Sequence, residues 1–281
     1  MKKVLITGAS TGIGLACAEY LANKNIQVFA GVRKDSDFER VNKLHDNIKA
    51  VKIDITNEES IQACLEILKS EIKPEDQFTL FNNAGIVRAG PLEFTPIDEF
   101  RWQLEVNVSA HVRVSQAFLP LLREVSDGRI IFTGSQSGFF TSPLMGPYCA
   151  SKHAIEAVSD ALRQELAVTS NIKVILIQPG QIKTPIWDKS ISDNHEIQKN
   201  YPPIANQFYG DVIPKIEVRA KDAAVNGAHT DVVAKDVLHA ITSHNPKTRY
   251  RHGKGAHLSY YLRILLSDKL RDGLIRFILK L

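Results

Sequence analysis

Short runs of β-branched and aromatic residues alternate with longer segments of helical apolar spacing, and this order constrains the fold more than any other feature. The expected strands are residues 3–7, 27–32, 48–53, 78–81, 129–133 and 172–177, and the clearest expected helices are residues 13–23, 58–70, 100–122 and 148–168. Such alternation requires crossover connections between parallel strands. The sequence therefore predicts an α/β fold, with a doubly wound parallel sheet of about seven strands and helices on both faces.

Length and patterning favour a single domain over residues 1–281, since α/β sheets of this kind often run past about 200 residues as one unit. The rhythm weakens after Pro185, where residues 186–230 are polar, aromatic and irregular. A segment of that length predicts a functional loop that covers the substrate. Residues 256–281 are expected to form a C-terminal amphipathic helix.

Several features favour a cytoplasmic location. The first expected strand begins almost at Met1, which is expected to leave no room for a cleaved leader. No apolar stretch reaches the roughly 18 residues of a membrane span. Three cysteines without CxxC spacing are typical of a reducing compartment. The net charge of +4 is too mild to indicate nucleic-acid binding.

A glycine-rich loop follows the first expected strand and opens the first expected helix, with the sequence Thr7-Gly8-Ala9-Ser10-Thr11-Gly12-Ile13-Gly14. Backbone amides and a helix N-terminus in this position can bind the diphosphate of a dinucleotide. Gly8 permits the tight turn, Gly12 lets the backbone approach phosphate, and Gly14 allows close packing of helix on strand. The loop predicts a Rossmann-like dinucleotide-binding fold.

Tyr148 and Lys152 lie four residues apart, so on a helix they share one face and the ammonium can approach the phenol. The spacing alone has little value, because Tyr20 and Tyr250 are followed by lysines in the same way. Only Tyr148 follows a strand that ends in a serine, Ser135. The Lys152 cation, together with the positive charge of an oxidised nicotinamide, would favour phenolate and lower a pKa that is ordinarily about 10. This arrangement predicts general acid–base chemistry on a carbonyl oxygen.

The glycine loop, Ser135, Tyr148 and Lys152, together with Asn107, give the chain a resemblance to the single-domain short-chain dehydrogenase/reductase family. The resemblance is clearest over residues 3–185. The residues that carry the resemblance are the loop at 7–14, Asp54, Asn82-Asn83-Ala84-Gly85, Asn107, Ser135, Tyr148-Cys149-Ala150-Ser151-Lys152 and Pro179-Gly180. The resemblance implies an oxidoreductase that interconverts a carbonyl and an alcohol by hydride transfer with a nicotinamide cofactor.

The resemblance also implies four catalytic residues. Tyr148 would be the acid/base, and Ser135 would hydrogen-bond the substrate oxygen. Lys152 would bind the nicotinamide ribose and tune Tyr148, and Asn107 would hold a helix kink and a water that relays protons to Lys152. The residues expected to bind the cofactor are Gly8, Ser10, Thr11, Gly12, Ile13, Gly14, Arg33, Lys34, Asp54, Ile55, Asn82, Ala84, Gly85, Tyr148, Lys152, Pro179, Gly180, Ile182 and Thr184. Among these, Asp54 would contact adenine, Asn82 would brace the sheet, and Thr184 would touch the carboxamide or a phosphate.

The choice between NADP(H) and NAD(H) follows from charge at the end of the second expected strand. A member of the family that uses NAD would place an aspartate there, whereas this chain has Val32 followed by Arg33 and Lys34. A carboxylate would bind the ribose 2′-hydroxyl and repel a 2′-phosphate, but Arg33 can pair with that phosphate. The sequence favours NADP(H) over NAD(H), and the alternative is two solvated basic residues at a strand end.

Within the family, the chain is most similar to the 17β-hydroxysteroid and retinol dehydrogenases. The similarity lies in Gly146-Pro147-Tyr148-Cys149-Ala150-Ser151-Lys152-His153-Ala154, Ala117-Phe118-Leu119-Pro120 and Pro246-Lys247-Thr248-Arg249-Tyr250. The residues expected to meet the substrate are Ser135, Phe139, Leu144, Met145, Tyr148 and Trp187. Their apolar members suit a lipophilic steroid-, retinoid- or long-chain-like carbonyl or alcohol, the alternative being ordinary core packing.

Residues 256–281 have apolar side chains at helical spacing with basic residues between them. Such a helix can lie on an anionic membrane surface, pack on the body, cover the active site or contact a second subunit. Apolar residues on more than one face of the helices expected at 100–122 and 148–168 predict a homodimer or homotetramer.

Other chemistries are weakly represented. The histidines have no spacing with Cys, Asp or Glu that indicates a metal site, so no metal is expected. Two other classes of function stay open: a cofactor-sensing protein with little turnover, and a peripheral membrane protein whose tail is its main interaction surface. The sensing class would normally lack one catalytic residue, whereas all four are present.

Overall fold

The computed structural model describes residues 1–279 and is built around a parallel sheet. Its strands are β1 (Lys2–Ile6), β2 (Gln27–Val32), β3 (Ile48–Lys52), β4 (Gln77–Asn82), β5 (Asp127–Thr133), β6 (Lys173–Pro179) and β7 (Arg249–His252). They are ordered β3-β2-β1-β4-β5-β6-β7, and every neighbouring pair is parallel. The predicted doubly wound parallel sheet is confirmed.

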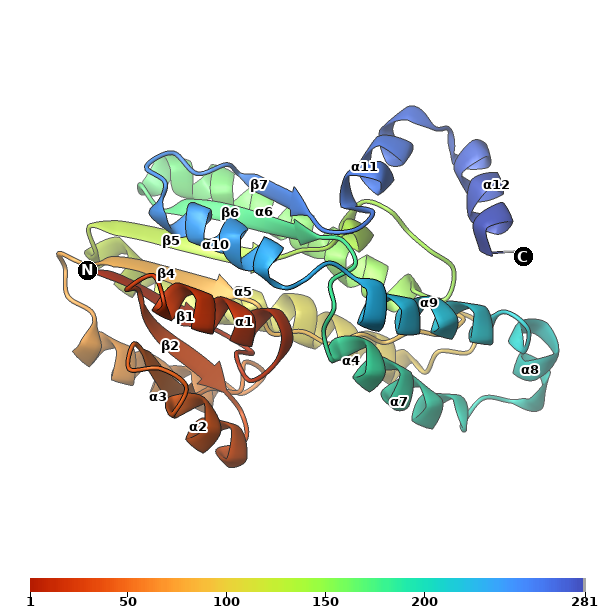
Figure 1. The fold of residues 1–281 in the computed structure, drawn as a ribbon, viewed down its shortest axis with the longest axis horizontal. Coiled ribbons are helices and arrows are strands. Elements are labelled where there is room, and N and C mark those ends of the chain that lie inside the picture. The colour runs from red at the N-terminus through yellow and green to blue at the C-terminus, as the bar shows by residue number, and fades with distance from the viewer. Residues whose placement is uncertain (280–281) are drawn as a thin grey trace.

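The helices are α1 (Gly12–Ala22), α2 (Asp35–Asn42), α3 (Glu58–Glu71), α4 (Ile97–Leu104), α5 (Ala110–Glu124), α6 (Gly146–Thr169), α7 (Ile186–Gln198), α8 (Pro203–Tyr209), α9 (Ile213–Asn226), α10 (Asp231–Thr242), α11 (Ala256–Leu265) and α12 (Asp268–Leu279). One face of the sheet is covered by α1 and α10, which pack on each other, and the other by α3, α5 and α6 (Figure 1). Within residues 1–279, no helix is long and apolar enough to cross a membrane.

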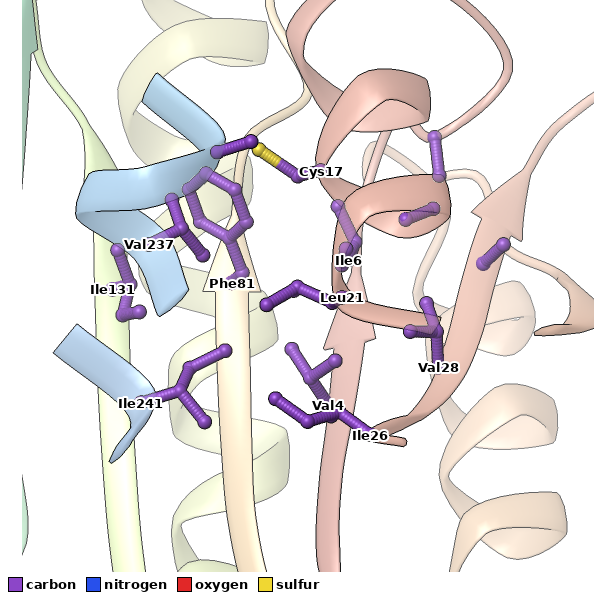
Figure 2. Packing of buried hydrophobic residues seen from close by; sticks show 14 of the residues in the cluster. Val4, Ile6, Cys17, Leu21, Ile26, Val28, Phe81, Ile131, Val237 and Ile241 are labelled. Carbon is purple, nitrogen blue, oxygen red and sulfur yellow. The ribbon is translucent and has the colours of Figure 1, made fainter. Parts of the chain in front are cut away.

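One apolar core lies on each side of the sheet, and successive side chains along each strand point into the two cores alternately. On β1, Val4 and Ile6 point into the core beneath α1 and α10, whereas Leu5 points into the core beneath α3, α5 and α6. Figure 2 shows the first of these cores, in which Leu21 of α1 and Ile241 of α10 meet the strand side chains. This period of two explains why the strands read as continuous apolar runs, because both of their faces are buried.

The single helix expected at 100–122 is interrupted. The chain runs from α4 through a π-helical segment, Glu105–Ser109, into α5. The buried Asn107 lies in that segment and directs its amide at the backbone of Ile86. Extra residues of this kind in a helix are frequent at functional sites, because they turn one side chain out of the regular pattern. The kink expected around Asn107 is therefore present as a π segment.

The prediction of an irregular loop over residues 186–230 was wrong, because the helices α7, α8 and α9 occupy most of this segment. Polar side chains on the buried face of α7 disguised the helical pattern. Asn194, which is buried, accepts a hydrogen bond from the amide of Ala89 (2.9 Å) and donates one to Ser190 (3.1 Å). A periodicity argument counts such residues as exposed, whereas here they fasten α7 to the segment after β4.

The C-terminal region also differs from the single helix expected at 256–281. It forms α11 and α12, separated at Leu266, whose backbone is extended, and Lys280 and Leu281 lie outside the described residues. β7 was not among the strands identified along the sequence. It is a polar edge strand in which Tyr250 alone is buried, so it lacks the apolar run that marks the central strands.

Candidate active site

The site lies where the winding of the sheet reverses. β1 pairs with β2 on one side and with β4 on the other, so the carboxyl ends of β1 and β4 diverge into different connections. Open α/β sheets bind ligands beside such a reversal, outside the carboxyl ends of the strands. The glycine loop after β1, the segment after β4 and Ser135 after β5 all lie at this edge.

The glycine loop is shaped by contacts that side chains would prevent. Gly8 has φ +66°, and a methyl group there would lie 2.7 Å from the Cα of Ala84. A methyl group on Gly14 would collide with the carbonyl oxygen of Gly8 and lie 2.5 Å from Nδ2 of Asn83. These two positions hold the loop against the segment after β4 and against α1.

Gly12 differs from the other two glycines of the loop. Its φ is +59°, yet the nearest atom to a methyl group there would be 3.5 Å away, on the buried Thr184. Gly12 is also the first residue of α1, which Thr11 precedes without a side-chain cap. A methyl group there would make only ordinary van der Waals contact, and uncapped amides at a helix N-terminus suit a diphosphate, so these residues fit a dinucleotide. Ser10 and Ile13, also expected to bind the cofactor, flank Gly12 in the same loop.

Thr7 and Asn83 tie the loop to β4, a role that the sequence analysis did not assign to them. The hydroxyl of Thr7 accepts hydrogen bonds from the amides of Asn83 (3.0 Å) and Ala84 (3.1 Å). Nδ2 of Asn83 donates to the carbonyl of Thr7 (3.0 Å). Asn82, which was expected to brace the sheet, is the last residue of β4 and donates to the hydroxyl of Ser115 on α5 (3.0 Å). The adjacent asparagines in the motif were the signal that could have found Asn83.

Asn107 joins three parts of the site. Its Oδ1 accepts from the amide of Ile86 (2.9 Å), and its Nδ2 donates to the carbonyl of Ile86 (3.0 Å) and to the hydroxyl of Ser151 (3.1 Å). Ser151 in turn donates to the carbonyl of Tyr148 (2.7 Å). Gly85 lies against Asn107, since a methyl group at Gly85 would be 3.3 Å from Oδ1. The π segment is thus bonded to the first turn of α6.

His111 is a further buried residue that the sequence analysis did not use. Its Nε2 lies 2.7 Å from the carbonyl oxygen of Ala84, and its Nδ1 has no protein partner within the described residues. Burial, followed by the charge of Lys152, lowers the pKa of His111 to about 3. The ring is therefore neutral and donates through Nε2, which holds the Ala84 carbonyl in place behind the loop.

Tyr148, Ser135 and Lys152 come together as the sequence predicts. Tyr148 is in the first turn of α6, and the hydroxyl of Ser135 hydrogen-bonds its phenol. Lys152 is buried one turn later, with Nζ 5.8 Å from the centre of the Tyr148 ring. That Nζ donates to the carbonyl of Thr133 (2.7 Å), which anchors it to the end of β5.

The protonation of the phenol differs from the expectation. Burial raises the pKa of Tyr148 to about 12, and the hydrogen bond from Ser135 opposes this only in part. Burial lowers the pKa of Lys152 to about 8, against an opposing charge on Glu156. The expected lowering of the Tyr148 pKa by Lys152 is therefore not the dominant effect here. With its pKa raised, the phenol keeps its proton at neutral pH, because a phenolate in this partly buried position would be poorly solvated.

The residues after β2 and β3 form the far end of the expected cofactor site. The Arg33 side chain is 58% exposed, and its Nη1 lies 4.0 Å from Oδ2 of Asp54. Asp54 also accepts hydrogen bonds from the amide and the hydroxyl of Thr56 (3.0 and 2.7 Å), and Ile55 between them is buried. Lys34 is exposed immediately before α2.

Arg40 of α2 adds a second basic group near the loop, which the sequence analysis missed. Its Nη2 donates to the carbonyl of Ser10 (2.6 Å) and to Oδ1 of Asp37 (2.8 Å). No spacing rule places a residue of α2 against the first glycine loop, so only the fold shows this contact.

The segment after β6 closes the other side of the site. The amide of Gly180, which follows Pro179, donates to the carbonyl of His252 (2.8 Å). Ile182 is buried, and its carbonyl accepts from the indole of Trp187 (2.8 Å). These bonds lead the chain to Thr184, opposite Gly12.

An apolar pocket adjoins this segment. Three of the residues expected to meet the substrate, Leu144, Met145 and Trp187, line it together with Val87, Ala89, Gly90, Ser190, Ile191, Asn194, Gln198, Ile213, Ile216, Glu217 and Ala220. Its free space is about 40 Å³, enough for a few waters or one small group.

Phe139 does not line this pocket. Its ring meets that of Tyr260 on α11 edge-on, with centres 5.6 Å apart, and the guanidinium of Arg251 lies 5.2 Å from its centre. Tyr201 and Tyr209, in the region expected to cover the substrate, pack on Phe94. Within residues 1–279, no group of three or more His, Cys, Asp or Glu side chains is placed to hold a metal ion.

Comparison with known proteins agrees with this geometry. Residues 2–195 match the model of a family described as short chain dehydrogenase. An NADPH-dependent 3-dehydrocapnine reductase of Ornithobacterium rhinotracheale is 34% identical over 255 residues, which are 89% of this chain and 87% of that protein. Retinol dehydrogenase 7 of Rattus norvegicus is 34% identical over 95% of this chain and 86% of its own.

A solved structure has the same fold. A short chain dehydrogenase/reductase from Burkholderia phymatum, in complex with NAD, superimposes with a TM-score of 0.76 over 92% of this chain and 91% of its own. At 24% identity, this likeness shows the fold alone.

Proposed function

This chain belongs to the short-chain dehydrogenase family, and we propose that it is an NADP(H)-dependent enzyme that interconverts a carbonyl and an alcohol on a lipophilic substrate. One observation carries the proposal: the Ser135 hydroxyl, the Tyr148 phenol and the Lys152 ammonium lie at the strand edge that also bears the glycine loop and the uncapped start of α1. A proton donor beside a nicotinamide site is what a carbonyl reductase requires.

The proposed roles follow from these contacts. When bound, the cofactor supplies the hydride for the carbonyl carbon, or accepts one from the alcohol. Tyr148 donates its phenolic proton to the carbonyl oxygen, and Ser135 holds that oxygen by a hydrogen bond. The Nζ of Lys152 is held by its hydrogen bond to the Thr133 carbonyl. From this position its positive charge compensates the negative charge that the phenol gains when it gives up its proton. Asn107 positions α6 through Ser151.

The protonation of the site agrees with Tyr148 as the proton donor in the reduction. A phenol whose pKa is raised to about 12 is protonated throughout the neutral range, so it is ready to act as an acid.

We propose that the 2′-phosphate of NADP(H) is bound by Arg33, with Lys34 adding positive charge. The support is the exposed Arg33 guanidinium at the end of β2, where no carboxylate follows Val32. The contact of Arg33 with Asp54 is long at 4.0 Å, so the guanidinium is free to pair with phosphate. Arg40, held at the Ser10 carbonyl, adds positive potential to the same end of the site.

Replacing Arg33 with alanine should remove most of the preference for NADPH. The wild type should bind NADPH at least about tenfold more tightly than NADH, because a charge-assisted contact contributes about 1.5–3 kcal/mol. The variant should bind NADH almost as the wild type does. Calorimetric titration with each cofactor measures this, and Arg101→Ala, an exposed arginine on α4, is the matched control. Equal affinities in the wild type would refute the assignment.

We propose that the substrate is lipophilic and that residues 186–230 cover it. The support is the apolar lining of the pocket between α7, α9 and the segment after β4. The test is NADPH oxidation against steroids, retinoids, long-chain aldehydes, quinones and small keto esters. Turnover of the bulky apolar compounds at lower KM than the keto esters supports the proposal, and the reverse order contradicts it.

We propose a cytoplasmic homodimer or homotetramer, assembled through the outer faces of α5 and α6. Cys17, Cys64 and Cys149 are buried and unpaired, which agrees with a reducing compartment. Light scattering at micromolar concentration should give a mass of at least twice the 31.3 kDa of the chain. A fully active monomer would rule the dimer out as a requirement.

A further inference from the structure

Glu156 is a carboxylate that lies behind Lys152, with a side chain only 17% exposed. It follows Lys152 by four residues on α6, so the two side chains share a face of the helix. The two residues also meet at Gly138, in the 3₁₀ turn that begins after Ser135. A methyl group on Gly138 would lie 2.8 Å from the carbonyl oxygen of Lys152 and 3.1 Å from Oε1 of Glu156. The carboxylate is therefore packed between α6 and the turn that follows Ser135.

Residues of two neighbouring strands hold the carboxylate of Glu156 in place. Its Oε1 accepts a hydrogen bond from Nε2 of Gln178 on β6 (2.6 Å), and its Oε2 accepts one from Nε of Arg249 on β7 (3.1 Å). Arg249 is shared with Asp160, which accepts from its Nη2 (2.7 Å). Gln178 in turn accepts from Nε of Arg251 (3.1 Å). Both oxygens of Glu156 are bonded to strand residues, so its negative charge has a fixed position behind the site.

The Lys152 ammonium has few charged neighbours. Its Nζ donates to the carbonyl of Thr133 on β5, which is a neutral acceptor. From α5, His111 acts on it, and that ring is neutral at pH 7 because its pKa is lowered to about 3. On its own helix, Tyr148 is a phenol that keeps its proton. Among residues 1–279, Glu156 is the carboxylate whose charge acts on Lys152.

This charge matters because burial alone would favour the neutral amine of Lys152. Burial lowers the pKa of Lys152 to about 8, even though the charge of Glu156 opposes the effect. A further fall would leave a large part of the amine uncharged at neutral pH. An uncharged amine would not compensate the negative charge that Tyr148 gains when it gives up its proton.

We propose that Glu156 is a positioning residue of the active site, whose fixed negative charge keeps Lys152 in its ammonium form through the neutral range. The inference rests on the proposed function, since the ammonium matters to turnover only if Tyr148 supplies the proton. An ordinary structural role for Glu156 would be to fasten α6 to β6 and β7 through Gln178 and Arg249. That role would affect stability but would not move the titration of Lys152.

Direct titration of Lys152 tests the proposal without any turnover. The full chain is labelled with ¹³C at the lysine Cε, and the NMR signal of Lys152 is identified by its absence in Lys152→Arg. In the wild type the signal should titrate with a midpoint at about pH 8. In Glu156→Gln the midpoint should fall by roughly one pH unit, because a nearby opposite charge is lost. Glu156→Asp keeps the charge and should titrate close to the wild type.

Asp160→Asn is the matched control, because it removes the other carboxylate bonded to Arg249 and leaves Glu156 in place. The Lys152 midpoint should not change in this variant. The double variant Glu156→Gln, Arg249→Gln removes the carboxylate together with its guanidinium partner, so that neither is left unpaired. It should show the same fall as Glu156→Gln, and it replaces that variant if the single change prevents folding. A wild-type midpoint in the variants that lack Glu156, or an equal fall in Asp160→Asn, would overturn the proposal.

The pH profile of NADPH oxidation, with the carbonyl compound of lowest KM in the substrate screen, gives a second measurement. Activity should fall as the pH rises through the pKa of Lys152, because the ammonium is lost. In Glu156→Gln this alkaline fall should begin at lower pH, by the same roughly one unit, and Glu156→Asp should restore it. A lower rate at every pH with an unmoved alkaline fall would show a structural role only and would overturn the proposal. If no carbonyl is reduced, the proposed function fails, whereas the titration of Lys152 still decides whether Glu156 holds its charge.

Discussion

Replacing Tyr148 with phenylalanine should lower turnover with NADPH and a reducible carbonyl by roughly 10²–10⁴-fold, the range for losing a general acid. The phenylalanine ring fills the same space but has no proton to give the carbonyl oxygen. Ser135 can still hold that oxygen, and Lys152 keeps its bond to the Thr133 carbonyl. The affinity for NADPH should therefore stay within a few-fold of the wild type, as measured by calorimetric titration.

The matched control for this change is Tyr20→Phe. Tyr20 is also followed by a lysine four residues later, and Nζ of Lys24 lies 5.9 Å from its ring centre, much like the pair in the site. It is on α1, away from Ser135, so its loss should leave turnover unchanged. A Tyr148→Phe enzyme that keeps more than about a tenth of the wild-type rate would remove Tyr148 from the role of acid. An unchanged circular dichroism spectrum would show that the variant is folded.

Alanine at Gly12 and at Gly14 should damage different properties of the protein, although the two glycines are two residues apart. At Gly12 the left-handed backbone costs about 1–2 kcal/mol, but the nearest neighbour, Thr184, is 3.5 Å from the added methyl. That methyl would stand where a diphosphate must approach the start of α1. We expect a folded protein that binds NADPH roughly 10–100-fold more weakly, as loss of charge-assisted hydrogen bonds implies.

Gly14→Ala should instead reduce stability. The added methyl would meet the carbonyl of Gly8 and the side chain of Asn83, which are held together by a hydrogen bond from Nδ2 of Asn83 to that carbonyl (3.3 Å). Such overpacking costs roughly 1–3 kcal/mol of unfolding free energy, measured by denaturant titration without cofactor. Normal NADPH affinity in Gly12→Ala would contradict a diphosphate at this loop. Normal stability in Gly14→Ala would contradict the close packing of α1 on the loop.

Much of the fold could be predicted from periodicity, because a buried parallel strand and an amphipathic helix leave different patterns in the chain. Those patterns fail where buried side chains are polar or where a strand is not apolar. α7 was missed because its buried face carries polar side chains: Asn194 accepts from the amide of Ala89 and donates to the hydroxyl of Ser190. β7 was missed because an edge strand need not be apolar.

For the candidate site, the sequence alone placed Gly8, Gly12, Ser135, Tyr148 and Lys152, because the left-handed glycines and the four-residue spacing on a helix are local properties. The tertiary structure decided what depends on distant neighbours. It decided that burial, rather than Lys152, governs the pKa of Tyr148.

The structure also moved individual residues away from their expected surroundings. Phe139 packs on Tyr260 instead of lining the pocket, and Arg40 reaches the loop from α2. The surroundings of a side chain depend on segments that are distant in the sequence. Its backbone preference and its position around a helix depend only on the neighbouring residues. That is why the grouping of Ser135, Tyr148 and Lys152 could be predicted from the sequence, while the protonation of Tyr148 and the shape of the pocket could not.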